Sequence, residues 1–222
     1  MLFWLLYGDT PMTLRDQQAK QTPPFPTACV PAKNISEPTS ALVGEIEQVL
    51  LARLPSLIKA PPPRRIACLG DVPPTLQARY PNAAWVNVAD GADADLIWGA
   101  FVGAASFTPY TPAVFRDINN ALADNGVFLL ATLGPQTLLP LQPLCSPATT
   151  PHAFASWPTL VELGNALVAA GLAKPVLDCE TLMFTYASAA DALAELARDG
   201  WFDASSCAQD ATQALTAADG SA

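Results

Sequence analysis

Residues 115–138, FRDINNALADNGVFLLATLGPQTL, decide the fold class of this chain. Apolar residues at helical spacing lead into the turn sequence Asp124-Asn125-Gly126, and the continuous hydrophobic run 127–133 follows. A strand without polar alternation is typical of the middle of a parallel sheet, because helices cover both of its faces. The stretch therefore predicts a helix over residues 111–123, a turn and a buried parallel strand.

Helices and strands alternate on both sides of this stretch. The other expected strands are 65–69 (RIACL), 84–88 (AWVNV), 95–101 (DLIWGAF), 176–177 and 182–186. The other expected helices are one from a Ser40 cap to Pro55, one over 74–80, one from the capping box of Thr159 and Glu162 to Gly171, and one from Ser188 to Gly200. This order predicts an α/β fold, with a doubly wound, largely parallel sheet in one domain over residues 40–200.

The two ends of the chain differ from this domain in composition. Residues 1–39 are expected to be a flexible N-terminal arm, since 13–38 are rich in Pro, Gln and Thr, and residues 201–222 a frayed tail. The opening run MLFWLLYGDTPM is too short for an integral membrane span and lacks the basic residues that begin a signal peptide. It is either a membrane-touching tail or, as we favour, a leader that is absent from a product starting at Met12.

Charge and cysteine usage argue against several classes of protein. A formal net charge of −9 opposes nucleic-acid binding, which requires neutralised phosphates. Five scattered cysteines and the single histidine, His152, indicate neither a metal site nor a disulfide framework, so we expect reduced thiols in a cytoplasmic protein. Charged residues make up only 14% of the chain, which suggests a surface that is either unusually apolar or covered by a partner.

Several segments, in order, resemble one enzyme family. They are 50–80, Asp95-Leu96-Ile97-Trp98, Asp124-Asn125-Gly126, 131–135 (ATLGP), 163–171 and 176–186. These segments are similar to the S-adenosylmethionine-dependent methyltransferases that methylate malonyl-[acyl-carrier protein] early in biotin synthesis. The resemblance implies a class I, Rossmann-like methyltransferase fold with S-adenosylmethionine as cofactor and acyl-carrier protein as partner. The acidic charge of this chain would repel an acidic carrier protein, which weighs against that partner.

The spacing of the matching segments indicates an internal deletion. From Ile66 to Ile97 there are about 30 positions, enough for a single βαβ unit of roughly that length. The family has more units here, so a helix, a strand and a helix are missing. The resemblance implies that the missing part walls the adenine and ribose pocket, and the sheet is expected to have a reduced number of strands.

The first-strand loop also departs from the family's glycine-rich turn. Here the chain reads Leu69-Gly70-Asp71-Val72-Pro73-Pro74, and the two prolines remove backbone donors. Gly70 and Asp71 are the candidates for contact with the cofactor's methionine end, although an Asp at this place often caps the next helix.

Two further residues are candidate cofactor ligands. Asp90 is the better candidate for accepting the ribose hydroxyls and Asp93 the poorer, but Asp90 also fits a solvated turn before Gly91. Trp98 lines a pocket at the edge of the sheet or, as is usual for aromatics on strands, packs in the core.

Three functions remain open from the sequence, and no side chain is singled out as catalytic. The chain is a methyltransferase-like pseudoenzyme or partner-binding subunit with impaired or lost S-adenosylmethionine binding, or an active methyltransferase with a remodelled cofactor loop. The third alternative is a decayed paralogue without activity. We favour impaired or lost binding, since methyl transfer needs few catalytic side chains but does need the cofactor cradle.

Overall fold

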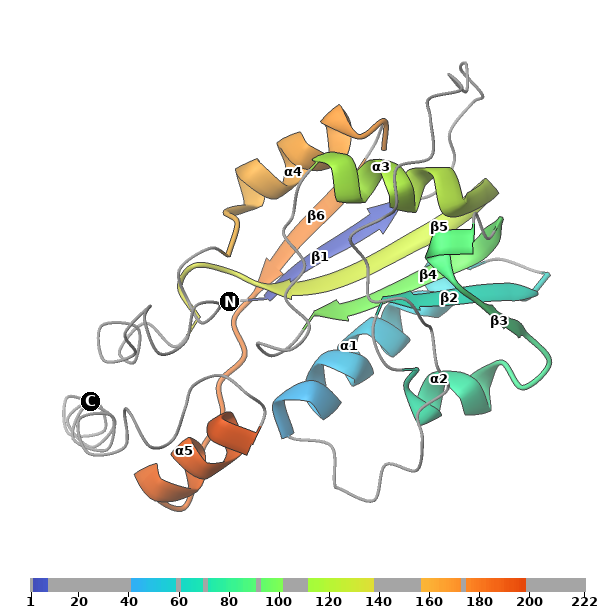
Figure 1. The fold of residues 1–222 in the computed structure, drawn as a ribbon. Helices are drawn as coiled ribbons and strands as arrows, with labels where there is room; N and C mark the ends of the chain where they lie inside the picture. The colour runs from blue at the N-terminus through green and yellow to red at the C-terminus, as the bar shows by residue number, and fades with distance from the viewer. Residues whose placement is uncertain are drawn as a thin grey trace.

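A computed structural model describes residues 2–7, 41–58, 61–69, 72–90, 93–101, 112–137, 157–172 and 175–198 of the chain. Its strands are β1 (Leu2–Tyr7), β2 (Arg65–Leu69), β3 (Ala84–Val86), β4 (Ala94–Phe101), β5 (Leu122–Leu133) and β6 (Val176–Glu180). Its helices are α1 (Ala41–Leu57), α2 (Pro74–Arg79), α3 (Pro112–Ala121), α4 (Leu160–Ala169) and α5 (Ala189–Arg198), with a 3-10 turn η1 (Val88–Asp90). Helices cover both faces of one sheet, with α3 and α4 on one side and α1 and α2 on the other (Figure 1).

The sheet has the strand order β3-β2-β4-β5-β1-β6. Strands β3, β2, β4 and β5 are mutually parallel, whereas β1 is antiparallel to both β5 and β6. The predicted α/β class with a largely parallel, doubly wound sheet is confirmed.

Two hydrophobic cores hold the layers together, one on each face of the sheet. The α1-side core contains Ile46, Leu50 and Leu54 of α1 together with Leu76, Leu129, Ala131, Leu133, Leu193 and Leu196. The α3-side core contains Phe115 and Ile118 of α3 together with Val88, Phe128, Leu130, Leu163 and Leu167. Strand β5 contributes alternate residues to each core, which explains why its sequence shows no polar alternation.

The turn predicted at Asp124-Asn125-Gly126 exists, but as a bulge inside β5. Ala94 pairs with Leu122 and Leu96 pairs with Val127, so the residues between Leu122 and Val127 are looped out. Asn125 has a positive φ of 63°. A Cβ on Gly126 would lie 2.6 Å from the backbone oxygen of Ala94, so this position admits only glycine without a backbone shift.

The helix ends around α4 and α5 follow the predicted local signals. The Thr159 side chain accepts from the Glu162 N–H at 3.2 Å while Glu162 accepts from the Thr159 N–H at 2.8 Å, which confirms the capping box. Gly171, with φ 90°, ends α4. At α5 the Ser188 Oγ accepts from the Asp191 N–H at 3.2 Å, as predicted.

Several predicted boundaries are wrong. The helix predicted over 111–123 is α3, Pro112–Ala121, and residues 122 and 123 already belong to β5. Helix α1 passes Pro55 and ends at Leu57, because a proline near the helix end removes one donor and Ile58 still bonds to the Leu54 carbonyl at 2.8 Å. The strand predicted over 84–88 stops at Val86. Residues 182–186 form no strand; the place beside β5 already holds β1, and Leu182 and Phe184 pack against the α1-side core instead.

The N-terminal residues are the main correction to the sequence analysis. Residues Leu2–Tyr7 were expected in a flexible arm, and that expectation is wrong, because they form β1 inside the sheet. A product starting at Met12, the interpretation that we favoured, would lack this strand between β5 and β6. The rest of the arm, including Ser40, and the tail 201–222 lie outside the described residues. None of the described helices is long and apolar enough to cross a membrane.

Candidate cofactor site at the carboxyl edge of the sheet

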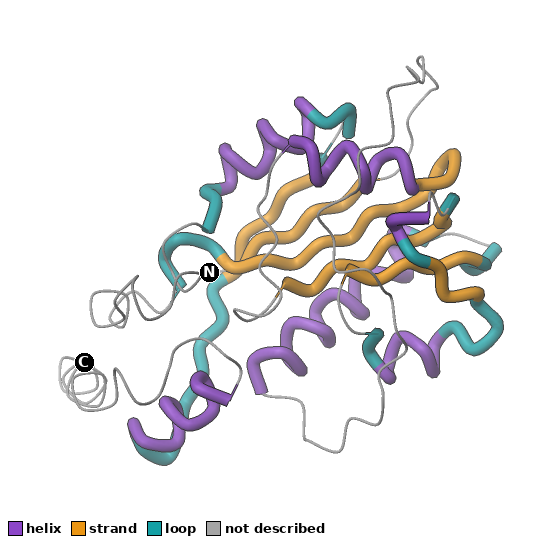
Figure 2. The backbone as a smooth tube through the Cα atoms, in the orientation of Figure 1, coloured by secondary structure: helices purple, strands orange, loops and turns teal. Residues whose placement is uncertain are grey.

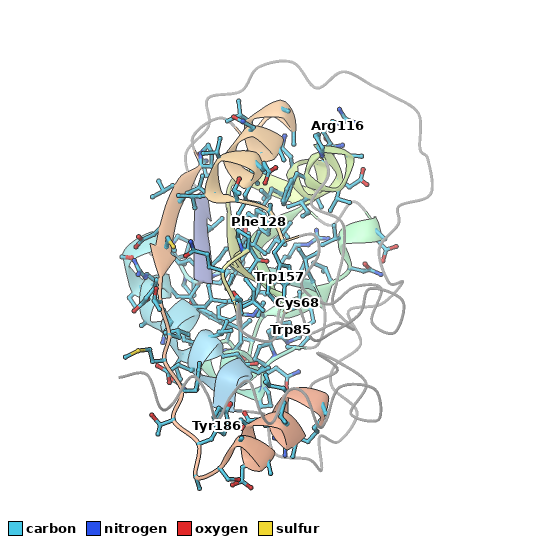
Figure 3. The ribbon with its side chains drawn as sticks, turned by 90° about the vertical axis from the view of Figure 1, so that its left-hand side faces the viewer. Cys68, Trp85, Arg116, Phe128, Trp157 and Tyr186 are labelled. Carbon is cyan, nitrogen blue, oxygen red and sulfur yellow. The ribbon has the colours of Figure 1, made fainter. Side chains whose placement is uncertain are left out.

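The carboxyl ends of the parallel strands meet at one edge of the sheet, where α/β proteins bind ligands. Strand β2 ends there at Leu69, β3 at Val86, β4 at Phe101 and β5 at Leu133. Figure 3 views the molecule from this side, with Trp157 and Cys68 drawn near the middle and Tyr186 below them beside α5. A cofactor of the class implied by the sequence would lie across this edge.

The connection from β2 to α2 is the place where the cofactor's methionine end would be held. Gly70 and Asp71, the predicted ligands, lie outside the described residues. On either side of them the chain is packed closely, since Leu69 is 7% exposed and Val72 is fully buried.

The N-terminus of α2 offers few backbone donors to an anion or a carboxylate. Pro73 is the N-cap residue and Pro74 is the first residue of the helix, so neither has an N–H. The N–H groups of Leu76 and Gln77 both donate to the Pro73 carbonyl at 3.0 Å. Of the four N–H groups that a helix start leaves free, Pro73 and Pro74 lack theirs and that of Leu76 is bonded, which leaves the N–H of Thr75. Helix α2 is also only six residues long. This end of the helix does not fit the anion-binding role that helix N-termini serve in nucleotide-binding folds.

Asp90 lies in η1, directly after β3, with an exposed side chain. Its N–H donates to the Asn87 carbonyl at 3.1 Å, and the Asn87 side-chain oxygen accepts from the Ala89 N–H at 3.0 Å. The 3-10 turn is thus fixed by local bonds, and the Asp90 carboxylate has no hydrogen-bond partner among the described residues. Asp93 is also exposed but precedes β4, so it lies at the opposite edge of the sheet from Asp90.

The return from β3 to β4 confirms how short this part of the fold is. Residues 87–93 carry the chain from the end of β3 to the start of β4, with η1 in place of a crossover helix. A connection between parallel strands usually needs a dozen or more residues and a helix. Strand β3 is the edge of the sheet and has three residues, so no further strand stands beyond it among the described residues.

Trp98 lies inside the protein. Its side chain is 1% exposed and belongs to the α1-side core, in register with Cys68 on β2 and Leu129 on β5. Its indole N–H has no hydrogen-bond partner among the described residues. Of the two interpretations offered by the sequence, this placement favours core packing over the lining of a pocket.

Two other polar side chains, those of Asn119 and Gln136, lie in structural positions. The Asn119 side chain donates to the Ala170 carbonyl at 3.4 Å and so joins α3 to the end of α4. Gln136 is exposed in the turn after β5, which is closed by the Thr137 N–H and the Gly134 carbonyl at 3.0 Å. His152 lies outside the described residues.

Two residues at this edge were missed by the sequence analysis. Trp157 is half-buried just before α4 and packs against the α1-side core, and Asn87 shapes the turn that carries Asp90. A polar residue at the end of a predicted strand was the available signal for Asn87. Trp157 follows a proline-rich stretch that gave no signal.

The described residues hold no cluster of three or more His, Cys, Asp or Glu side chains placed to bind a metal ion. Cys68 and Cys179 form no disulfide with a described residue. Burial raises the pKa of the Asp117 carboxyl on α3, which the nearby Arg116 partly opposes. Arg116 is drawn on the side of the sheet that α3 covers, well away from Trp157 (Figure 3).

Comparison with curated proteins identifies the relatives of this arrangement. The malonyl-[acyl-carrier protein] O-methyltransferase of Gallionella capsiferriformans is 29% identical over 102 residues, 46% of this chain and 34% of the relative. Those of Laribacter hongkongensis and Xylella fastidiosa are 32% and 31% identical over 92 and 107 residues, which is 41% and 48% of this chain and 30% and 35% of each relative. No family model matches the chain.

The resemblance to malonyl-[acyl-carrier protein] O-methyltransferases is confirmed. The fold agrees with it, since the sheet and its helices are of the Rossmann-like methyltransferase kind. The match is partial, and the chain spans about a third of the length of the curated relatives it matches. Partial coverage agrees with the shortened β2–β4 region.

Proposed function

We propose that this chain is a methyltransferase-like protein related to the malonyl-[acyl-carrier protein] O-methyltransferases in which S-adenosylmethionine binding is impaired or lost. It then acts as a non-catalytic, partner-binding subunit of the cytoplasm. The observation that carries the proposal is the N-terminus of α2, where Pro73 and Pro74 lack backbone N–H donors and the Leu76 N–H bonds to the Pro73 carbonyl. A cofactor with a charged amino-acid end needs donors at this place.

The shortened edge of the sheet supports the same proposal. With a three-residue β3 at the edge and residues 87–93 as the return, the described fold supplies little wall for a nucleoside beyond β2. Fold similarity by itself does not carry activity, because unrelated functions share such sheets.

One observation favours the alternative, an active methyltransferase with a remodelled loop. The exposed Asp90 carboxylate follows β3, where a ribose-binding acidic residue would be required. In that alternative Gly70 and Asp71 contact the methionine end of the cofactor, and acyl-carrier protein is the candidate partner.

Ligand titration decides between the two. The purified chain is melted with S-adenosylmethionine and with S-adenosylhomocysteine up to millimolar concentration, and both ligands are titrated calorimetrically. A site with a Kd a hundredfold below the ligand concentration would stabilise the fold by about 2.7 kcal/mol, which moves Tm by several degrees. We expect no shift and no heat, whereas the full-length Gallionella relative serves as positive control.

Two variants sharpen the result. Replacing Pro73 and Pro74 together by Gly returns two backbone donors, and gain of binding in this variant alone would support the missing-cradle explanation. If the native chain does bind, Asp90→Asn should weaken binding at least tenfold. Binding by the native chain, abolished by D90N, would overturn the proposal in favour of the active enzyme.

A further inference from the structure

Strand β1 occupies a slot inside the sheet. It pairs with β5 on one side, from Leu2 opposite Leu133 to Tyr7 opposite Phe128, and with β6 on the other side. Neighbouring strands lie 4.7–4.9 Å apart, so without β1 the strands β5 and β6 would border an opening of about 10 Å. Figure 2 shows this strand as one of the inner strands, not as an appendage.

The β5 wall of the slot is buried on both faces of the sheet. Positions opposite Leu2, Trp4 and Leu6 on β5 belong to the α1-side core, and positions opposite Phe3, Leu5 and Tyr7 are Thr132, Leu130 and Phe128 of the other face. All of these β5 residues are at most 3% exposed. The β5 wall therefore favours an uncharged, apolar strand, and β1 has the sequence LFWLLY. On the other wall, β6 has the exposed residues Asp178 and Glu180 opposite Trp4 and Leu2.

The far wall of the slot, β6, is held in place independently of β1. Leu177 packs so closely on α4 that a Cβ on Gly164 would lie 2.9 Å from it. On the other face the Arg53 guanidinium of α1 pairs with the Asp178 carboxylate at 3.5 Å. Among the described strands β6 pairs only with β1. When β1 leaves, the contacts of Leu177 with α4 and of Asp178 with Arg53 would therefore be the ones that keep β6 near its place.

The covalent link to β1 is long. Residues 8–40 separate Tyr7 from the first residue of α1, and a chain of that length can span at least roughly 100 Å when fully extended. No short turn among the described residues joins β1 to β5 or to β6, in contrast to the strands of a hairpin. The docking of β1 therefore resembles the binding of a peptide to a sheet, with main-chain bonds for affinity and alternate side chains for selectivity.

We propose that β1 is a separable strand and that β5 and β6 form a specific binding slot for it. The slot accepts an extended, uncharged, apolar segment of about six residues, antiparallel to β5, whether that segment is tethered or free. Its occupant is the segment Leu2–Tyr7 of the same chain.

The test uses the full chain with a protease recognition sequence inserted after Thr22, cleaved after folding. The N-terminal fragment should stay with the body in gel filtration, and backbone amides of β5 and β6 should keep their protection from hydrogen exchange. A labelled peptide of residues 1–11 in excess should then replace the fragment slowly. The uncleaved protein with the same insertion is the control.

Leu5→Pro in the labelled peptide is the matched negative control, because it removes a ladder donor in mid-strand. The same change in the intact chain should lower Tm by at least roughly 5 °C and expose the amides of β6 first. Release of the cleaved fragment without loss of Tm or of amide protection would overturn the proposal. Equal replacement of the fragment by the native and the Leu5→Pro peptides would also overturn it. A third contrary outcome is a dimer in which each intact chain docks β1 into the slot of the other chain and not into its own.

Discussion

The two ends of the parallel sheet differ in how completely they are built. At the β2–β3 end, the strand β3 has three residues, α2 has six and no side chain caps it. At the β5–α4 end, β5 has twelve residues and α4 is closed by a capping box and a glycine with positive φ. The comparison shows that the framework of the fold is complete at the β5–α4 end and short at the β2–β3 end, where a nucleotide cofactor would bind.

The largest expected effect breaks the stronger end of the sheet. In Gly126→Val, the new Cβ would approach two backbone oxygens, those of Ala94 at 2.6 Å and Ala123 at 3.0 Å, and neither can move alone. We expect a loss of about 3 kcal/mol or more in the free energy of unfolding, measured by urea denaturation. Gly44→Ala is the control, since nothing lies within 4 Å of its Cβ and the helix gains about 0.5–1 kcal/mol. A loss in G126V no greater than 1 kcal/mol would contradict the bulge geometry.

The second prediction compares the core of the two ends directly. Leu129→Ala on β5 removes a fully buried side chain and should cost about 2–5 kcal/mol, because the surrounding layers close only partly over the cavity. Val86→Ala on the edge strand β3 removes a half-buried side chain and should cost about 1 kcal/mol or less. Urea denaturation of both variants measures the difference. Equal losses would show that the short end is as firmly packed as the long one.

The third prediction concerns the helix caps. Thr159→Ala removes the two bonds of the Thr159 hydroxyl, which accepts from the Glu162 N–H and donates to the Glu162 carboxylate, and should cost about 1 kcal/mol. Thr75→Ala at the uncapped start of α2 should cost only a few tenths. The bonds from Thr159 lower the pKa of the Glu162 carboxyl in the folded protein. Stability from this group is therefore present above its unfolded pKa and is lost as pH falls through the lowered value. Thermal melts between neutral and acidic pH should show that Tm falls less with decreasing pH in Glu162→Gln than in the native protein. An equal fall of Tm in the two proteins would contradict a contribution of the Glu162 charge to the cap.

The smallest expected effect lies on α1. Burial raises the pKa of the Glu47 carboxyl, so the folded state disfavours its ionised form. Stability should fall as pH rises from the unfolded pKa through the raised folded value, and Glu47→Gln should remove that fall. At neutral pH the Gln variant should melt slightly higher than the native protein, and the two should converge in acid. A lower Tm for E47Q at neutral pH would show that the carboxylate has a favourable partner.

Local signals predicted much of the framework. The strand Arg65–Leu69 has the predicted bounds, and the capping box, the Gly171 stop and the Ser188 cap are all present. These features depend on neighbours within a few residues, so the sequence contains both partners. The candidate site was less predictable: Asp90 is exposed at the expected edge, but Trp98 belongs to the core, and Gly70 and Asp71 lie outside the described residues.

Errors arose where the partner is remote in the chain. No local pattern indicates that the Ala41 N–H at the start of α1 donates to the Glu195 carboxylate of α5 at 2.7 Å. Ser40, the predicted cap of α1, lies outside the described residues. The segment 182–186 has the composition of a strand, yet it packs over the α1-side core because its place in the sheet is taken. Composition gives the tendency of a segment, whereas competition for a place in the sheet decides the outcome.

The sequence by itself determined the α/β class, the alternating elements, most helix ends and the shortening between Ile66 and Ile97, since each follows from spacing and residue type. Only the tertiary structure decided the strand order, the burial of Trp98 and the insertion of Leu2–Tyr7 between β5 and β6. The physical reason is that a strand's hydrogen bonds are made with other strands, and no local pattern specifies which strands those are.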